Sequence, residues 1–423
     1  MYFVLLLIVS LAVLADVDMC HVTRTKYQIA ADGYTLKYVQ LVARHGDRAP
    51  GDSYDSDNGN FDCGYVEESH VYSGDGVKVS HTASTKRGLV DKKWNPYATD
   101  FYWKGSCESS QLTPEGISMH YSLGTHIDEI YRITLKLLPT IFDPAIVKIR
   151  TSAKTRTIQS TQALFQTLYP IERRGSNVDI EFITRPYEIE TMRPNPSCCP
   201  IISSIEKGYL DNEELIKRRA QQPFADAFQK LKYVTGFSSD APYLYDYVDI
   251  ITPRVCHDQP LPRKILVNFT MDDYNALVDE YLWENTLFFS KELSVYQSGF
   301  FVEEMLNDYT EALKNKVVYQ QYTAHDTTIY GLLALLGEET TQPIQYASTL
   351  AFEYYNKADE MYVRVLLNDK VLKLNDICIE VDGMCKYSDF ETKMKALIPK
   401  YEDCQVKDSI HRTLSRKGWY TYN

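Results

Sequence analysis

The sequence lacks an excess of basic residues: 45 Lys and Arg stand against 57 Asp and Glu, a formal net charge of −12. This balance argues against a nucleic-acid-binding protein, because phosphate backbones are bound by basic surfaces. A small anionic substrate is not excluded, since a few clustered arginines can reverse the field inside one cleft. Hydrophobic residues (44%) and charged residues (24%) have globular proportions, which excludes a disordered chain, a collagen and a coiled coil.

Internal repeats and low-complexity tracts are also absent. Tyrosine, in contrast, is abundant, with 33 copies. We interpret most of these tyrosines as surface and loop residues rather than as a platform for stacking on sugars. The length of 423 residues fits one large domain or two to three smaller ones.

A long hydrophobic run is missing beyond the N-terminus, where Tyr2 to Leu14 form an apolar stretch. This stretch is too short to span a bilayer comfortably, which takes ~20 residues. We expect residues 1–15 to be a signal peptide, with Val13-Leu14-Ala15 as its cleavage pattern; a short membrane anchor is the alternative. The mature chain is then expected in the secreted space or the lumen of the secretory pathway, Golgi and lysosome included, with no stable membrane span.

All 9 cysteines follow the predicted cleavage site, and in a secreted chain they indicate disulfides. Because the number is odd, at least one thiol is free or pairs with another chain. Cys198-Cys199 and Cys256-His257 do not have the spacing of zinc ligands, so we expect no metal. Asn268 begins an N-glycosylation sequon, which fits the same compartment.

Three times a strand-like run leads into a polar loop and then a helical pattern. The runs are Tyr38–Ala43, Ala145–Ile149 and Val317–Tyr322. This order is typical of an open α/β sheet whose ligand lies beyond the carboxyl ends of the strands. The core is expected to comprise 16–190 and 312–423.

Two segments interrupt this core. Residues 51–110, rich in Gly, Asp, Ser and Tyr, are interpreted as a long insertion. Residues 191–311 are mostly helical in pattern, which predicts a smaller helical cap domain. One core helix is expected to begin near Thr113 and Pro114. The helix that follows Val317–Tyr322 is expected to end at Gly337.

The first loop places His45 between Arg44 and Arg48. Nearby positive charge disfavours the imidazolium form, so the ring should stay neutral and nucleophilic when no anion is bound. Two guanidiniums in one loop also offer forked donors to a phosphate group. A basic surface turn with a satisfied histidine is the alternative.

The other two loops extend this pattern. Arg156 stands at a helix N-terminus, where backbone amides favour an anion, and Lys154 is nearby. His325 can donate to a phosphoryl oxygen, and Asp326 can protonate a leaving oxygen if burial or a bound phosphate keeps it protonated. Each loop alone also fits an ordinary solvated turn. Together they match phosphoryl transfer through a phosphohistidine, with no metal or cofactor.

These residues carry a family resemblance. Arg44 to Pro50 resembles the RHGxRxP signature of the histidine acid phosphatases, and His325-Asp326 resembles their His-Asp pair. Gln111 to Gly116 resembles the QLTxxG helix start of that family. The resemblance implies a mostly parallel α/β sheet flanked by helices, like that of the phosphoglycerate mutases, with a helical cap. It also implies roles: nucleophile His45, proton donor Asp326, and phosphate ligands Arg44, Arg48, Arg156 and His325.

Finer details are similar to the 2-phosphoxylose phosphatase branch, which acts on a phosphorylated xylose in a proteoglycan linker. The segment Lys154 to Ser160 and the cysteine-bounded insertion carry this likeness, whereas the usual acid phosphatase stretch has an Asp before its third arginine. The resemblance implies a phosphomonoester or phosphorylated glycan as substrate and suggests a homodimer. It implies three disulfides, Cys63–Cys107, Cys199–Cys404 and Cys378–Cys385, and leaves Cys20, Cys198 and Cys256 open.

Two other functions compete with a phosphatase that acts on a sugar or glycan. A phytase-like inositol phosphate phosphatase would share both motifs. A catalytically silent secreted binding protein could use the same scaffold, although all six site positions carry the expected residues.

Overall fold

A computed structural model gives the architecture of the chain. It describes residues 17–63 except 53, 55, 56 and 58, and also 70–72, 78–82, 105–175, 180–237, 243–338 and 341–405. The predicted signal peptide lies outside the described residues. None of the described helices is long and apolar enough to cross a membrane.

The core is a mixed sheet that confirms the expected α/β class. Its strands lie in the order β10-β9-β8-β1-β7-β4, and β11 pairs with β9. The three strands expected from the sequence, β1, β7 and β4, are parallel neighbours, whereas β8 to β11 add an antiparallel edge. The strands span Thr35–Arg44 (β1), Val147–Thr151 (β4), Tyr319–Ala324 (β7), Thr349–Lys357 (β8), Glu360–Leu367 (β9), Lys370–Val371 (β10) and Cys385–Lys386 (β11).

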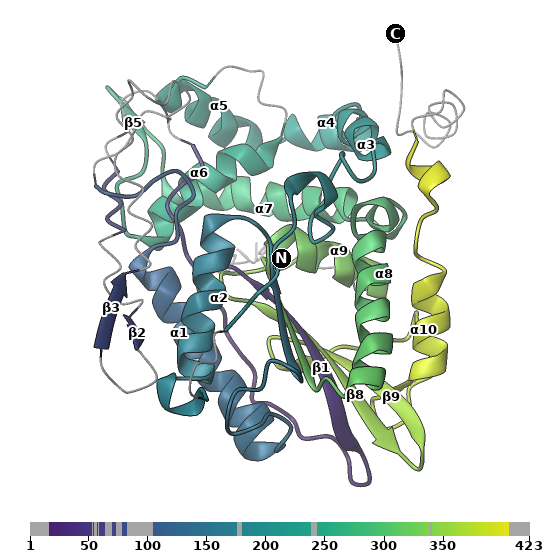
Figure 1. Cartoon of the computed structure of the whole chain (residues 1–423). Coiled ribbons are helices and arrows are strands. Elements are labelled where there is room, and N and C mark those ends of the chain that lie inside the picture. The colour runs from purple at the N-terminus through teal and green to yellow at the C-terminus, as the bar shows by residue number, and fades with distance from the viewer. Residues whose placement is uncertain are drawn as a thin grey trace, which may run out of the picture.

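Helices cover both faces of the sheet because its central strand is apolar on both sides. Val39, Leu41 and Ala43 of β1 pack towards α1 and α2, and Tyr38 and Val42 pack towards α8 and α9. Figure 1 shows α1 and α2 on one side of the sheet and α8 and α10 on the other. These helices span Pro114–Ile127 (α1), Thr155–Leu168 (α2), Lys291–Asn315 (α8), Asp326–Leu336 (α9) and Tyr387–Lys395 (α10).

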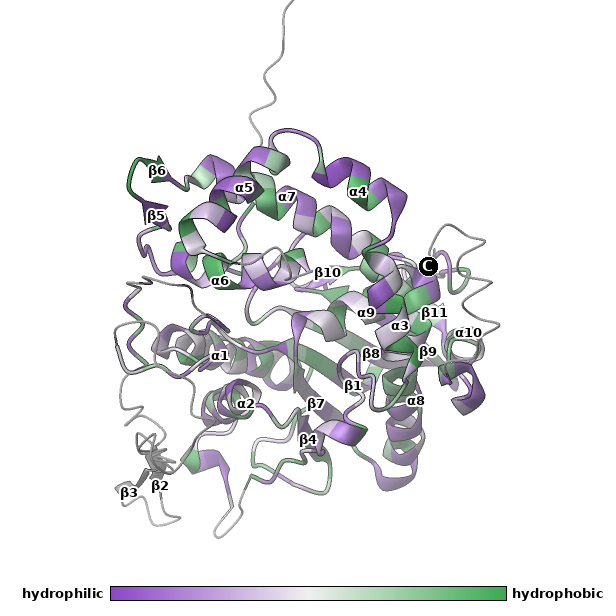
Figure 2. Cartoon of the chain, turned by 90° about the horizontal axis from the view of Figure 1, so that it is seen from above, coloured by the Kyte–Doolittle hydropathy of each residue, from purple (hydrophilic) through white to green (hydrophobic). Residues whose placement is uncertain are grey.

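A second group of helices lies between α2 and β7 in the sequence. In Figure 2, α5, α6 and α7 lie together, apart from the sheet. Their own apolar cluster contains Leu231, Tyr247, Ile251 and Leu277. The group comprises Ile201–Tyr209 (α3), Glu213–Arg219 (α4), Phe224–Thr235 (α5), Leu244–Cys256 (α6), Met271–Phe288 (α7) and the short strands Arg263–Lys264 (β5) and Val267–Asn268 (β6).

The cap over 191–311 remains a proposal as a separate domain, because most of α8 falls within these limits. Phe301 and Met305 of α8 pack in the cluster that lies against the sheet. The remaining short elements are His70–Tyr72 (β2), Lys78–Thr82 (β3), a π-helical turn at Asp128–Thr134 (η1), and single turns at Ile171–Arg173 (η2), Tyr187–Ile189 (η3) and Tyr401–Cys404 (η4).

Of the four disulfides, three join segments that are far apart in the sequence and Cys378–Cys385 closes a short loop. Three of the four are the pairs implied by the resemblance, and the remaining one joins Cys20 to Cys256, which leaves Cys198 as a free thiol. Cys20–Cys256 fixes the N-terminal segment to the last residue of α6. Such a set of disulfides is typical of a protein that folds in an oxidising compartment.

Many of the tyrosines are core residues, so our interpretation of them as mainly surface and loop residues is wrong. The rings of Tyr309 and Tyr354 are stacked, and the ring of Tyr38 is tilted against both. Some of the buried hydroxyls have a hydrogen-bond partner, whereas those of Tyr38 and Tyr309 have none among the described residues. Tyr354 donates to Gln40 Oε1 at 2.8 Å and Tyr131 donates to Glu353 Oε1 at 2.8 Å.

Candidate active site

Three loops meet at the carboxyl edge of the parallel strands. In the strand register, Arg44 lies opposite Ala324, and Thr151 lies opposite Thr323. The ladder continues one residue further, since the backbone amide of His45 donates to Ala324 O at 3.1 Å and that of Ser152 donates to Thr323 O at 3.1 Å. The side chains that follow β1, β4 and β7 are therefore placed by backbone pairing.

The first loop packs directly on the start of α1. Thr113 caps α1, with its hydroxyl accepting from Gly116 N, and Pro114 is the first helical residue, as predicted. A Cβ at Gly46 would lie 2.3 Å from Gly116 O. Only glycine at position 46 allows the loop and the helix to approach this closely.

His45 is oriented for attack through one nitrogen. It is 2% exposed, and its Nδ1 lies 2.8 Å from Gly46 O. A carbonyl oxygen only accepts, so Nδ1 carries the proton and Nε2 keeps its lone pair. Burial lowers the pKa of His45 well below 6.5, and the charges of Arg156, Arg44 and Arg48 lower it further. The ring is therefore neutral over a wide pH range.

Two of the three arginines around His45 are paired with carboxylates. Arg44 Nη2 lies 2.9 Å from Asp326 Oδ2, and Arg48 Nη2 donates to Asp249 Oδ1. Arg156 has no ion-pair partner within the described part of the chain; burial and the charge of Arg48 lower its pKa to about 10. The three guanidiniums and two carboxylates leave a net charge of +1, which suits one phosphate group.

His325 lies beside His45, with 5.7 Å between the ring centroids. It forms the N-cap of α9, which ends at Gly337 in a left-handed conformation, as predicted. Arg156 Nη2 donates to Nδ1 of His325 at 3.5 Å, so Nε2 carries the proton and donates to Ser152 Oγ at 2.9 Å. Burial and the charges of Arg156, Arg193 and Arg48 lower the pKa of His325 well below 6.5.

A family model described as the histidine phosphatase superfamily, branch 2, matches residues 35–368. The chain belongs to branch 2 of the histidine phosphatase superfamily. Counting factor 60 of Dictyostelium discoideum is 26% identical to it over 408 residues, which cover 91% of each chain. The 2-phosphoxylose phosphatase 1 of Danio rerio is 25% identical over 382 residues, covering 80% of this chain and 73% of the relative.

Among solved structures, the apo form of Hafnia alvei phytase covers 90% of this chain and is itself covered completely. The TM-score is 0.58 and the sequence identity is 15%. This likeness shows the fold: a phytase-like histidine phosphatase with a mixed core sheet and many helices.

In this histidine phosphatase, the pocket wall formed by α6 was not predicted from the sequence. Tyr245, Val248, Asp249 and Thr252 recur on one face of that helix and line the pocket that contains Arg44 and Asp326. The opposite walls come from separate segments: Met19, Tyr281, Tyr330, Ile344 and Tyr346. These residues come from separate segments of the chain, and the interpretation of the tyrosines as surface and loop residues gave no sign of this wall.

A second missed contact joins the signature loop to the end of α6. His257 Nε2 donates to Asp47 Oδ2 at 2.5 Å, and the hydroxyl of Thr113 donates to the same carboxylate. Burial lowers the pKa of His257, but the hydrogen bond and charge of Asp47 outweigh it and raise that pKa. No local pattern in the sequence indicates this contact, because Asp47 and His257 are 210 residues apart.

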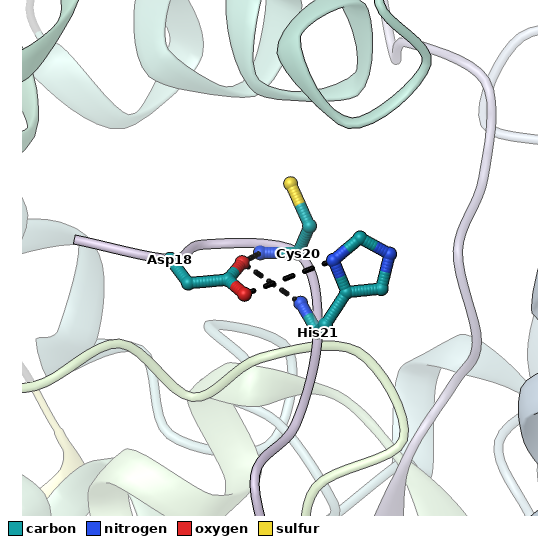
Figure 3. Close-up of side chains that lie close together, drawn as sticks. All are labelled: Asp18, Cys20 and His21. Atoms are coloured by element: carbon teal, nitrogen blue, oxygen red, sulfur yellow. Dashed lines mark hydrogen bonds and ion pairs between the residues drawn. The ribbon is translucent and has the colours of Figure 1, made fainter. Parts of the chain in front are cut away.

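Among the described residues, two clusters contain side chains of the types that bind metal ions. In both clusters, some of these side chains already form hydrogen bonds or a disulfide. Figure 3 shows Asp18 beside Cys20 and His21; its Oδ1 accepts from both backbone amides, at 2.7 and 3.0 Å. The sulfur of Cys20 is in a disulfide, so it is not a thiolate ligand. In the second cluster, Asp47, Glu115 and His257, the Asp47–His257 hydrogen bond occupies the two central ligand atoms.

Proposed function

We propose that this chain is an acid phosphatase that hydrolyses phosphomonoesters through a phosphohistidine at His45. The observation that carries this proposal is the ring of His45, whose Nδ1 is hydrogen-bonded to Gly46 O and whose pKa is lowered by burial and by the charges of the three arginines. The arginines bind the negative charge of the phosphate group. His45 can attack phosphorus because its Nε2 carries no proton. Because the pKa of His45 is strongly lowered, the nucleophile stays available in acidic medium.

The proposed reaction has two steps. Nε2 of His45 attacks phosphorus as the bond to the leaving oxygen breaks, and Asp326 gives its proton to that oxygen. Water then attacks the phosphohistidine, its proton passes to Asp326, and inorganic phosphate leaves. The nonbridging oxygens are held by Arg44, Arg48, Arg156 and His325, and His325 donates to phosphate only when its Nε2–H leaves Ser152 Oγ.

Asp326 is suited to this role because it forms the first residue of α9 and touches Arg44. Its Oδ1 accepts from Thr327 N at 2.8 Å, and its Oδ2 pairs with Arg44. A phosphate group that takes up the Arg44 donors leaves the carboxyl beside a second negative charge. Asp326 then lies beside the oxygen that must receive a proton.

For the substrate we propose a phosphorylated sugar or glycan in the secretory pathway. The relative named 2-phosphoxylose phosphatase 1 and the exposed sequon residue Asn268 support this class and compartment. The four disulfides support passage through an oxidising lumen. A homodimer is part of the same proposal.

The decisive experiment compares the wild type with His45→Ala and with a control, His126→Ala. His126 lies outside the pocket and pairs with Asp369 at 2.7 Å. Phosphate release is measured from p-nitrophenyl phosphate, a 2-phosphoxylosyl glycan and inositol hexakisphosphate, at acidic and neutral pH. Labelled phosphoenzyme is sought after denaturation in alkali.

We expect His45→Ala to lose all phosphate release and all label while it keeps the wild-type melting transition. The control should keep both. Turnover by folded His45→Ala would remove the covalent mechanism, and inactivity of the wild type on every phosphomonoester would leave a binding protein.

A further inference from the structure

The inner wall of the pocket changes character between the phosphate site and α6. At the phosphate site the lining residues are Arg44 and Asp326, and Arg48 and Arg156 act on His45 through their charge without lining the pocket. Beyond Arg44 and Asp326 the wall consists of tyrosine rings, a few apolar side chains and one further charged group, the carboxylate of Asp249. A leaving group that extends from a bound phosphate towards α6 therefore meets aromatic faces and a negative charge.

Asp249 is held at this position by the fold. It lies on the same face of α6 as Tyr245 and Thr252 and contacts Arg48 Nη2. The other Nη of Arg48 donates to Ala49 O at 3.1 Å, and Nε of Arg48 has no hydrogen-bond partner among the described residues. Arg48 can thus turn donors towards a phosphate while Asp249 stays beside it.

Other groups on α6 respond to the negative charge of Asp249. The charge of Asp249 is the largest cause that raises the pKa of Tyr245, and Tyr245 is 38% exposed at the entrance. Burial raises the pKa of Asp246, one turn earlier on α6, to about 6, with further contributions from Asp249 and Asp52. The cations beyond the three arginines, Lys154 and Arg193, act on His325 and do not line the pocket.

We propose that Asp249 selects the leaving group. The pocket favours phosphomonoesters of alcohols or phenols that have an aromatic or apolar face and carry an ammonium or hydroxyl donor at the end away from the phosphate. It disfavours leaving groups that carry a second anionic group. The carboxylate accepts a hydrogen bond from the donor and repels carboxylate, sulfate or further phosphate. This inference rests on the proposed function and narrows its substrate class, because a pocket that disfavours a second anionic group does not suit inositol phosphates with several phosphate groups.

Three aryl phosphates with nearly identical leaving phenols test the proposal. They are the O-phosphates of tyramine, tyrosol and phloretic acid, which end in an ammonium, a hydroxyl and a carboxylate. The rate constant kcat/KM is measured for the wild type, Asp249→Asn and Asp246→Asn. Asp246→Asn is the matched control, since it removes a charge from the same helix and leaves the Arg48 contact.

The wild type should prefer tyramine phosphate over phloretic acid phosphate by about tenfold, which corresponds to ~1.4 kcal/mol. Tyrosol phosphate should fall between them. Asp249→Asn should bring the ratio to about one to two, and Asp246→Asn should keep most of it. A wild-type ratio near one, or an unchanged ratio in Asp249→Asn, overturns the proposal.

A binding measurement separates this inference from the catalytic one. Dissociation constants of the three compounds are determined by calorimetry on His45→Ala, alone and combined with Asp249→Asn. The same order of affinity without turnover in the wild type would keep the selectivity and remove the phosphatase. Turnover of all three compounds at equal rates and with equal affinities would keep the phosphatase and remove the selectivity.

Discussion

The phosphate end of the pocket is built from loops that follow three parallel strands, whereas the leaving-group end is built from one face of α6 and tyrosines from separate segments. Backbone pairing fixes the first end, since His45 and Ser152 continue the strand ladder. Side-chain packing and the Cys20–Cys256 disulfide fix the second end. Substrate preference can therefore change through α6 while the phosphate site is preserved.

Charge separates the two ends as clearly as construction does. Arg156 brings an uncompensated cation to the phosphate, and Asp249 brings an anion to the leaving group. Changes at the first end should affect every substrate, and changes at the second should affect the ratio between substrates. Three variants of the phosphate end test this division.

The largest effect is expected for Arg156→Ala. Loss of a donor aimed at the developing charge should lower kcat/KM by about 10²- to 10³-fold for every phosphomonoester. The ratio between the tyramine and phloretic acid phosphates should stay constant. Lys154→Ala, which removes an exposed cation two residues earlier, is the control and should change kcat/KM only severalfold. A substrate-dependent loss in Arg156→Ala would break the division between the two ends.

Asp326→Asn should have a smaller effect that depends on the leaving oxygen. An alkyl phosphate needs the proton more than p-nitrophenyl phosphate does, so its kcat should fall by about 10²-fold and that of the aryl ester by much less. Steady-state kinetics with a series of phenyl and alkyl phosphates measures the slope. Equal slowing across the series would count against Asp326 as the acid.

The smallest effect concerns stability and pH at the phosphate end. His120 is fully buried, its Nε2 donates to Arg44 O at 3.1 Å, and burial lowers its pKa to about 3. In the unfolded chain this histidine binds a proton below about pH 6.5, but in the folded chain it does not until about pH 3, so its stabilising contribution is lost as pH falls through this window. His45 and His325 act in the same direction.

We therefore expect the free energy of unfolding to fall between pH 6.5 and 4.5, and His120→Gln to reduce that slope by up to ~1.4 kcal/mol per pH unit. Urea titrations in phosphate-free acetate and imidazole buffers measure it. His126→Gln, which removes a partly buried histidine outside the pocket, is the control for the loss of a histidine as such. An unaltered slope in His120→Gln would contradict the lowered pKa.

Local rules predicted most of the phosphate end. The Thr113 cap, the Gly337 cap and the three loops after apolar runs all depend on neighbours in the sequence. The turn between β8 and β9 shows what local rules leave open, since the strands pair as far as Lys357 and Glu360. Ala358 and Asp359 form the turn with positive φ, which local composition does not specify.

The sequence alone determined which chemistry is available, because His45, Asp326 and the arginines follow strands whose hydrophobic pattern is local. Only the tertiary structure decided how that chemistry is directed. It brought Asp249 to Arg48 and His257 to Asp47, contacts that span 201 and 210 residues. Such pairs arise from the packing of α6 over the sheet edge, and no periodicity or short motif encodes a contact at that separation.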